Sequence, residues 1–178
     1  MSDSSVITNE NGWLKRGYNS SYCRPKFAVM NPELTMTLPK YQTASGCVDI
    51  MMHTMERYFN HCDNMELTDG ISEHLLRTVM KNAKILMDEP QCYKARAEVM
   101  WAGSLSHNGL MACGNDGGDW ACHQLEHELG ECLMWRTAQD LQRYGEVGRV
   151  TFVTLFRIGL NNLRLMLWAW KTVMTKMQ

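Results

Sequence analysis

The sequence predicts a mainly α-helical domain preceded by a small amount of β-structure. Apolar residues recur with helical spacing from Tyr41 onward, whereas two short runs near the amino terminus are typical of strands. These runs are Ser4–Thr8 and Phe27–Met30. Neither G-x-G-x-x-G nor G-x-x-x-x-G-K-[ST] occurs anywhere in the sequence, which argues against a nucleotide-binding βαβ unit in this chain.

Each expected strand is followed by residues that favour turns, Asn9-Glu10-Asn11-Gly12 after the first and Asn31-Pro32 after the second. A first helix is expected over about Thr43–Asn60. Its apolar face would hold Val48, Met51, Met52, Met55 and Phe59. A second helix is expected from about Asp69 to Asp88, with an apolar face of Ile71, Leu75, Val79 and Ile85.

Two further helices are expected beyond residue 89. Pro90 would open the third, whose apolar face includes Ala95, Val99, Met100 and Leu105. Residues 114–118, Gly-Asn-Asp-Gly-Gly, are typical of a loop. Asp119 is then expected to cap a fourth helix that continues through Leu129.

The charge is divided unevenly along the chain. The whole sequence of 178 residues carries a formal net charge of −1, so no basic surface for nucleic acid is expected. Residues 1–130 contain 11 Lys and Arg against 16 Asp and Glu, whereas residues 131–178 contain 7 against 3. This contrast indicates that the last 48 residues differ in function or in origin from the rest.

The cysteines and the apolar segments bear on cellular location. The 7 cysteines form no C-x-x-C pair, and the polar, acidic start is unlike a signal peptide, so a reduced, cytoplasmic protein is expected. Charged and amide side chains interrupt the apolar region Val150–Met174, so no membrane span is expected. Arg157, Arg164 and Lys171 recur every seven residues, a pattern also found in helices that bind membrane surfaces or partners.

Two pairs of side chains have the spacing of metal ligands on a helix. Asp49 and His53 are four residues apart in the first expected helix, and His123 and His127 are four apart in the fourth. Such pairs on neighbouring helices can build a divalent metal site, and a carboxylate with imidazoles suits Fe(II) or Zn(II). The same spacings also occur in proteins without metal, where the histidines are merely hydrogen-bonded.

The remaining histidines and Cys122 are not expected to belong to a functional site. His61, His74 and His107 have polar neighbours and are expected at the surface or in turns. Cys122 precedes His123, but adjacent residues point to different faces of a helix, so a thiolate nucleophile is not expected there.

At these residues the sequence resembles the iron-containing alcohol dehydrogenases, in the branch of NAD(P)H-dependent butanol dehydrogenases. Four segments within residues 1–130 carry the resemblance: RPKFAVMNPEL from Arg24, TLP from Thr37, GCVDIMMHTME from Gly46 and DWACHQLEHELG from Asp119. It implies a helical metal-binding domain of an iron-containing alcohol dehydrogenase, with a short β remnant of the amino-terminal α/β dinucleotide-binding domain.

The resemblance also implies roles for individual residues. Asp49, His53 and His123 would bind iron, or zinc as in some members, and His127 would lie near substrate and cofactor. Lys15 and Leu34 fall where the family contacts the nicotinamide of NAD(H) or NADP(H). The reaction would be hydride transfer between a small primary alcohol or aldehyde and the nicotinamide, and family members are often homodimers.

The sequence departs from the family pattern at both ends. The glycine-rich phosphate-binding region expected before residue 1 is missing, and Thr137 stands where the family has its fourth ligand, a histidine. Residues 131–141 can be encoded by bases that, read from the last base of the Gly130 codon, spell GMFDVAHGAGL, the family-like sequence. A frame-shifted tail is therefore expected, and the sequence of the gene tests it.

Three segments follow from this interpretation. Residues 1–40 would be the remnant of the dinucleotide-binding domain, residues 41–130 the helical iron-binding domain and residues 131–178 the divergent tail. The isolated chain is expected to be weakly active or inactive. The alternatives are a non-catalytic metal-binding helical module, or a surface-binding protein that uses its basic tail.

Overall fold

The computed structural model describes residues 2–9, 11, 14–60, 62–118, 120 and 123. The chain divides into two compact units, Met1–Gly118 and Asp119–Gln178. The fourth expected helix falls almost wholly outside the described residues, and the expected tail of residues 131–178 falls entirely outside them.

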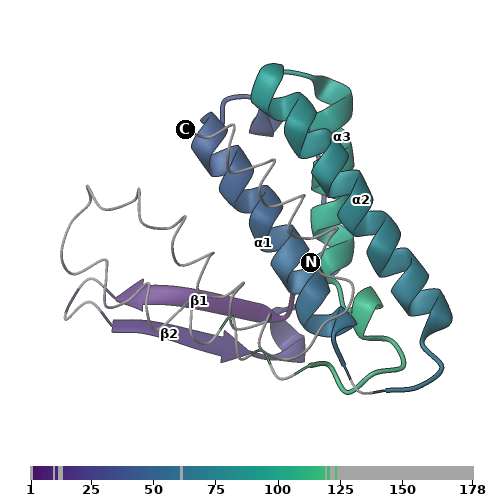
Figure 1. Ribbon diagram of the computed structural model, residues 1–178. Helices are drawn as coiled ribbons and strands as arrows, with labels where there is room; N and C mark the ends of the chain where they lie inside the picture. The colour runs from purple at the N-terminus through teal and green to yellow at the C-terminus, as the bar shows by residue number, and fades with distance from the viewer. Residues whose placement is uncertain are drawn as a thin grey trace. The chain divides into compact units, whose positions relative to one another are not determined.

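The amino-terminal residues form a two-stranded antiparallel hairpin. β1 (Ser4–Asn9) pairs with β2 (Leu14–Asn19), in a register that places Ser4 opposite Asn19 and Asn9 opposite Leu14 (Figure 1). The expected strand at Ser4–Thr8 is confirmed. Its partner was not expected, because LKRGYN alternates poorly and contains a glycine.

The expected strand at Phe27–Met30 is wrong. These residues belong to no strand, and the side chains of Phe27 and Val29 are 78% and 86% exposed. A strand needs a hydrogen-bonding neighbour, and the described sheet consists of β1 and β2 alone. Short 3₁₀ turns flank this segment at Ser21–Cys23 and Pro32–Thr35.

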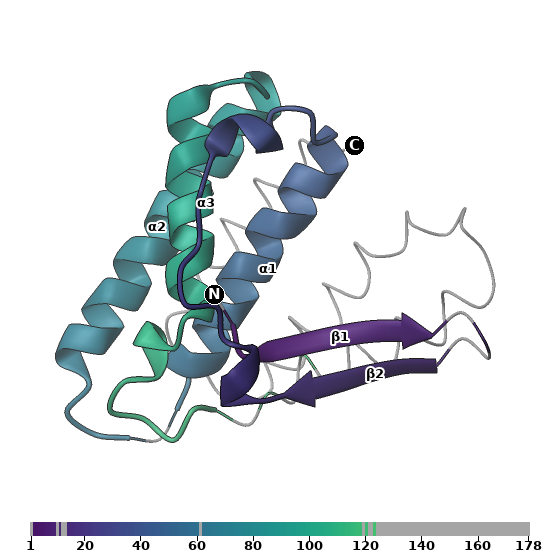
Figure 2. The same cartoon turned by 180° about the vertical axis from the view of Figure 1, so that it is seen from behind.

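Three long helices follow, as expected: α1 (Lys40–Tyr58), α2 (Glu66–Asp88) and α3 (Tyr93–His107). Each helix contacts the other two (Figures 1 and 2). α1 and α2 start about one turn earlier than expected, because the carbonyls of Pro39 and Met65 already accept from the amides of Thr43 and Asp69. Pro90 lies in the turn before α3 rather than at its first residue.

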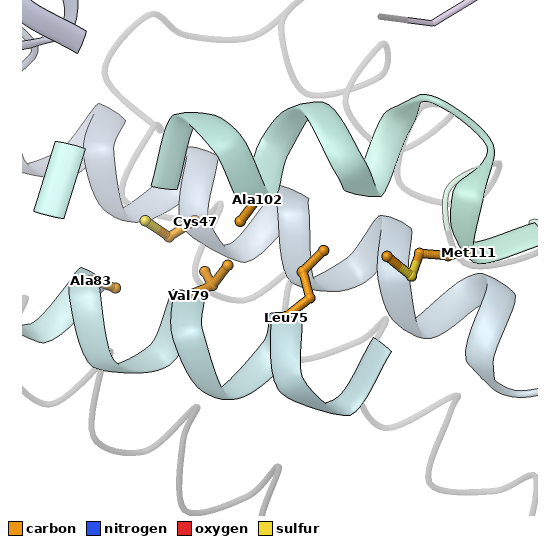
Figure 3. Packing of buried hydrophobic residues seen from close by; sticks show 6 residues of the cluster. All are labelled: Cys47, Leu75, Val79, Ala83, Ala102 and Met111. Atoms are coloured by element: carbon orange, nitrogen blue, oxygen red, sulfur yellow. The ribbon is translucent and has the colours of Figure 1, made fainter. Parts of the chain in front are cut away.

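The core between the helices is built from small and medium side chains. Cys47 from α1, Ala102 from α3 and three residues of α2 point toward one another, with Met111 from the short 3₁₀ helix Leu110–Ala112 at one end (Figure 3). The α2 residues are Leu75, Val79 and Ala83.

The expected apolar face of α1 is only partly correct. Met55 is buried, but the other four expected residues are half-buried. Ala44 and Cys47 occupy the closest contact instead, because small side chains allow α1 to approach its neighbours.

The expected loop at residues 114–118 is confirmed, and three of its glycines have positive φ. Gly118, with φ of 78°, passes so close to α1 that an added Cβ would lie 2.4 Å from the carbonyl oxygen of Glu56. Only glycine fits this position without displacing backbone.

No helix among the described residues is long and apolar enough to cross a membrane. The cysteines that the structure describes, at positions 23, 47, 62, 92 and 113, are free thiols.

Candidate metal centre

Asp49 and His53 lie one turn apart on α1, as their spacing requires. The Asp49 Oδ1 atom is 3.7 Å from the His53 Nε2 atom. The Asp49 side chain is 56% exposed and the His53 side chain 21%, so the carboxylate faces solvent while the imidazole is largely covered. The pair thus presents one carboxylate and one imidazole at an accessible face of the helix.

His107, the last residue of α3, joins this pair. Its ring packs against the ring of His53, with centroids 3.9 Å apart and planes tilted by 40°. Its Nε2 atom is 3.7 Å from the Asp49 Oδ2 atom. The two oxygens of one carboxylate therefore each face an imidazole nitrogen, one from α1 and one from α3.

The expectation that His107 is a surface or turn residue is wrong. Its side chain is 25% exposed, whereas His74, for which the same was expected, is indeed exposed. The sequence around His107 carries no signal of its contact with Asp49, because no ligand-type residue lies three or four positions before it on α3. Only the packing of α3 against α1 brings it to Asp49.

Hydrogen bonds fix the ring orientation of His107. The Nδ1 atom lies 2.9 Å from the carbonyl oxygen of Gly103 and 2.7 Å from the Ser106 Oγ atom. Ser106 Oγ itself donates to the Gly103 carbonyl. Both neighbours of Nδ1 thus accept, so Nδ1 carries a proton and Nε2 is the atom turned toward Asp49.

Arg57 ties the backbones that carry the two histidines. Its Nη1 atom donates to the carbonyl oxygen of His53 at 2.8 Å and to that of Ser106 at 3.0 Å. Burial lowers the pKa of the Arg57 guanidinium, and the nearby charges of Asp3 and Glu56 act in the opposite direction. The Arg57 guanidinium thus links α1 to α3 beside the two imidazole rings.

The helices α1 and α3 also pack closely beside the two histidines. A Cβ atom on Gly103 would lie 3.1 Å from the Ile50 Cδ1 atom of α1, a tight contact. The lack of a side chain at Gly103 lets α3 lie near α1 one turn before His107.

His123 belongs to the second unit, where it is helical and its ring lies edge-on to that of Trp120, with centroids 5.1 Å apart. His127 lies outside the described residues.

The two residues expected at the nicotinamide lie in the first unit. Lys15 is in β2, and Leu34 is in the 3₁₀ turn Pro32–Thr35 with its side chain 77% exposed. The roles expected for Lys15, Leu34, His123 and His127 stay predictions.

The donor set in the first unit suits a transition metal ion. A carboxylate and two imidazoles match the preference of Fe(II) and Zn(II), whereas Mg(II) and Ca(II) prefer oxygen ligands. Asp49 and His53, with His107 beside them, offer donor atoms of this kind, so the chemistry of the side chains fits a bound metal.

Comparison with known proteins gives several matches that cover the helices. Residues 43–134 match the description "Fe-containing alcohol dehydrogenase family, C-terminal". NADH-dependent butanol dehydrogenase A of Clostridium acetobutylicum is 46% identical over 129 residues, which are 72% of this chain and 33% of that protein. The NADPH-dependent aldehyde reductase YqhD of Escherichia coli is 38% identical over 124 residues, 70% of this chain and 32% of that protein.

Comparison with solved structures also finds similarity to a butanol dehydrogenase. The crystal structure of NADH-dependent butanol dehydrogenase A from Thermotoga maritima superposes with a TM-score of 0.71 at 37% identity, covering 83% of this chain and 35% of that chain. The present chain thus spans about a third of the length of the curated relatives that it matches.

Proposed function

Because the chain belongs to the iron-containing alcohol dehydrogenase family, we propose that it is the metal-binding helical part of an NAD(P)-dependent alcohol dehydrogenase. Asp49, His53 and His123 hold the metal in this proposal. The observation that carries it is the Asp49–His53 pair, which lies on one face of α1 inside the matched residues 43–134.

Ferrous iron is the metal we propose, with zinc as the alternative. Bound at these side chains, it would supply Lewis acidity toward the oxygen of an alcohol or an aldehyde. The negative charge of Asp49 offsets part of the metal charge, and the solvent exposure of its carboxylate leaves room for a small substrate to approach. Arg57 keeps the backbone of His53 in place through the hydrogen bond to its carbonyl.

Other residues complete the proposed site. His127 would lie beside substrate and cofactor, while Lys15 and Leu34 would contact the nicotinamide. The substrate class is small primary alcohols and aldehydes, as the names of the matched butanol dehydrogenase and aldehyde reductase suggest. The nucleotide is NAD(H) or NADP(H), since the matched relatives include both kinds. We further propose a cytoplasmic location and a homodimer.

We expect little or no alcohol oxidation from the 178-residue chain alone. Its sequence contains neither G-x-G-x-x-G nor G-x-x-x-x-G-K-[ST], and a nucleotide without such a phosphate-binding turn loses much of its binding energy. With Thr137 at the position of the fourth family ligand, the metal should also bind less tightly than in the family pattern.

A non-catalytic metal-binding module is the second candidate, and the grouping of Asp49, His53 and His107 within Met1–Gly118 favours it. Metal binding without turnover of NAD(P)H would indicate this function. A third alternative, surface binding by the basic tail, concerns residues outside the described part of the chain.

The proposed function is tested by measuring bound metal and turnover on the same preparations. The full chain is purified without oxygen, loaded with Fe(II), and analysed for metal and for NADH- and NADPH-dependent conversion of butanol and butyraldehyde. We expect bound iron in the wild type and its loss in Asp49→Ala and His123→Ala. His74→Ala is the matched control, because His74 is exposed on α2.

Folding can be separated from binding in this test. The side chain of Asp49 is more than half exposed, so Asp49→Ala should change the free energy of unfolding by no more than about 0.5 kcal/mol. A wild-type chain that binds no Fe(II) or Zn(II) would contradict the proposed metal site. Turnover that Asp49→Ala abolishes would contradict the expected low activity while supporting the proposed reaction.

A further inference from the structure

We propose that His107 is a metal ligand, so that α1 and α3 together supply Asp49, His53 and His107 to one cation. This inference rests on the proposed function for the presence of a metal, but it adds a donor that the family pattern does not assign. The juxtaposition that carries it is a carboxylate whose two oxygens each face an imidazole Nε2 atom at 3.7 Å.

Each imidazole lies close enough to Asp49 for the carboxylate and that ring to bind the same ion. At 3.7 Å, the contact between His107 Nε2 and Asp49 Oδ2 is too long for a hydrogen bond. Two donors that bind one ion at about 2.0–2.2 Å each lie no more than about 4.0–4.4 Å apart. The separation from His107 to Asp49, like that from His53 to Asp49, falls within this limit.

The ring of His107 has the orientation that ligation needs. Its Nδ1–H group donates to the Gly103 carbonyl and to the Ser106 Oγ atom, both near the end of α3. Metal-bound histidines usually donate their second ring N–H to a carbonyl or a carboxylate, which leaves the other nitrogen for the ion. The Nε2 atom of His107, the one that remains, faces the carboxylate.

The surroundings hold His107 at this place. The neighbouring ring of His53 limits the rotation of the His107 ring, and Arg57 fixes the carbonyl of Ser106 relative to that of His53. The position is therefore set by contacts that do not depend on bound metal, so the ligand is preorganised.

The proposal also gives a role to the change at position 137. Where the family pattern has a histidine ligand, this sequence has Thr137. An imidazole from α3 would restore the number of donors without any residue of the tail.

Metal titrations of the full chain test the proposal. Co(II) is the probe, because its visible absorption reports the donor atoms and Fe(II) oxidises readily. His107→Asn retains an N–H donor for the Gly103 carbonyl, and His107→Phe retains a ring against His53; both lack the Nε2 atom. His74→Asn and His74→Phe are the matched controls on the exposed face of α2.

We expect both His107 variants to weaken Co(II) binding by more than about 100-fold, which exceeds the usual effect of losing an outer hydrogen-bond partner. Their residual Co(II) absorption should differ from that of the wild type, and the His74 controls should match the wild type. Circular dichroism and thermal melting identify any variant that fails to fold, and the remaining variant then decides.

Two results would overturn the proposal. Wild-type affinity in His107→Phe would mean that the ring only packs against His53. A loss of about 10- to 100-fold with an unchanged Co(II) spectrum would mean that His107 only positions Asp49.

The same titrations separate this proposal from the proposed function. If His123→Ala abolishes binding while His107→Phe does not affect it, the family site stands and the His107 inference fails. If His107→Phe weakens binding and His123→Ala has no effect, the ion is held by α1 and α3 alone and the family site fails. If Asp49→Asn leaves binding unchanged, both fail.

Discussion

The helices α1 and α3 contact each other in two ways along their length. Near Cys47 and Ala102 the contact is apolar and part of the core that α2 completes (Figure 3). Near His53 and Ser106 it is polar, with the Arg57 guanidinium donating to a main-chain carbonyl of each helix. Apolar contacts depend mainly on volume, whereas directed hydrogen bonds fix which residues face one another.

This difference explains how the candidate metal centre acquires its geometry. The apolar region supplies most of the stability, since burial is the dominant favourable contribution to folding. The polar region adds less, but it sets the positions of His53 and His107. Substitutions in the two regions should therefore separate stability from metal affinity.

The largest effect on stability is expected in the apolar region. Leu75→Ala should lower the free energy of unfolding by about 2–5 kcal/mol, because it removes buried methyl groups and leaves a cavity. Chemical denaturation measures this change. Leu67→Ala, at an exposed position of the same helix, should cost no more than about 0.5 kcal/mol. Equal losses in the two variants would contradict the assigned core.

The next effect concerns the apolar region at alkaline pH. Burial raises the pKa of the Cys47 thiol to about 11, although the charge of Arg96 acts to lower it. The thiol has a pKa near 9.0 in the unfolded state, so the folded state loses the Cys47 proton at a higher pH than the unfolded state does. Stability should therefore be intact below pH 9 and fall by about 2–3 kcal/mol as the pH rises to about 11.

Denaturation curves across this pH range measure the effect as a difference between variants. Cys47→Ala should lose less stability than the wild type between pH 9 and pH 11, because the buried thiol is gone. Cys23→Ala, which removes an exposed thiol, should behave as the wild type does. Identical pH dependence in all three proteins would show that Cys47 is not buried.

A smaller loss is expected in the polar region. Arg57→Met removes the charged donor to the His53 and Ser106 carbonyls and should cost about 1.5–3 kcal/mol. It should also weaken metal binding, because His107 is no longer held against His53. Arg77→Met, which breaks the exposed ion pair with Glu73 on α2, should cost less than about 1 kcal/mol and leave metal binding unchanged. Unfolding curves and Co(II) titrations of both variants measure these effects.

Local pattern accounts for the part of the fold that the sequence predicts well. The three helices follow from apolar spacing, and the Asp49–His53 pair follows from a separation of four residues, because both depend on the geometry of one helix. Strand pairing and contacts between helices depend instead on two segments of the chain and on how they lie together. The wrong strand at Phe27–Met30 and the missed strand at Leu14–Asn19 both depend on which segment lies alongside.

His107 illustrates the same limit within the candidate site. Its own helix gives no indication of a ligand, and its approach to Asp49 depends on the crossing of two helices that are separated by α2 in the sequence. Likewise, the small residues Ala44 and Cys47 form the buried contact of α1 because of how closely its neighbours lie. Periodicity describes one helix at a time and cannot supply such distances.

The bonds of Arg24 imply an order in which the chain can fold. Arg24 binds the Asp3 carboxylate at 2.9 Å and the Asn108 carbonyl at 3.1 Å, the latter across 84 residues of sequence. α1, α2 and α3 are joined by short connections and can associate early, because contacts between near neighbours in sequence form fastest. Although the ribosome makes Arg24 long before Asn108, the link from Asp3 through Arg24 to Asn108 is complete only after the end of α3 has been made and folded.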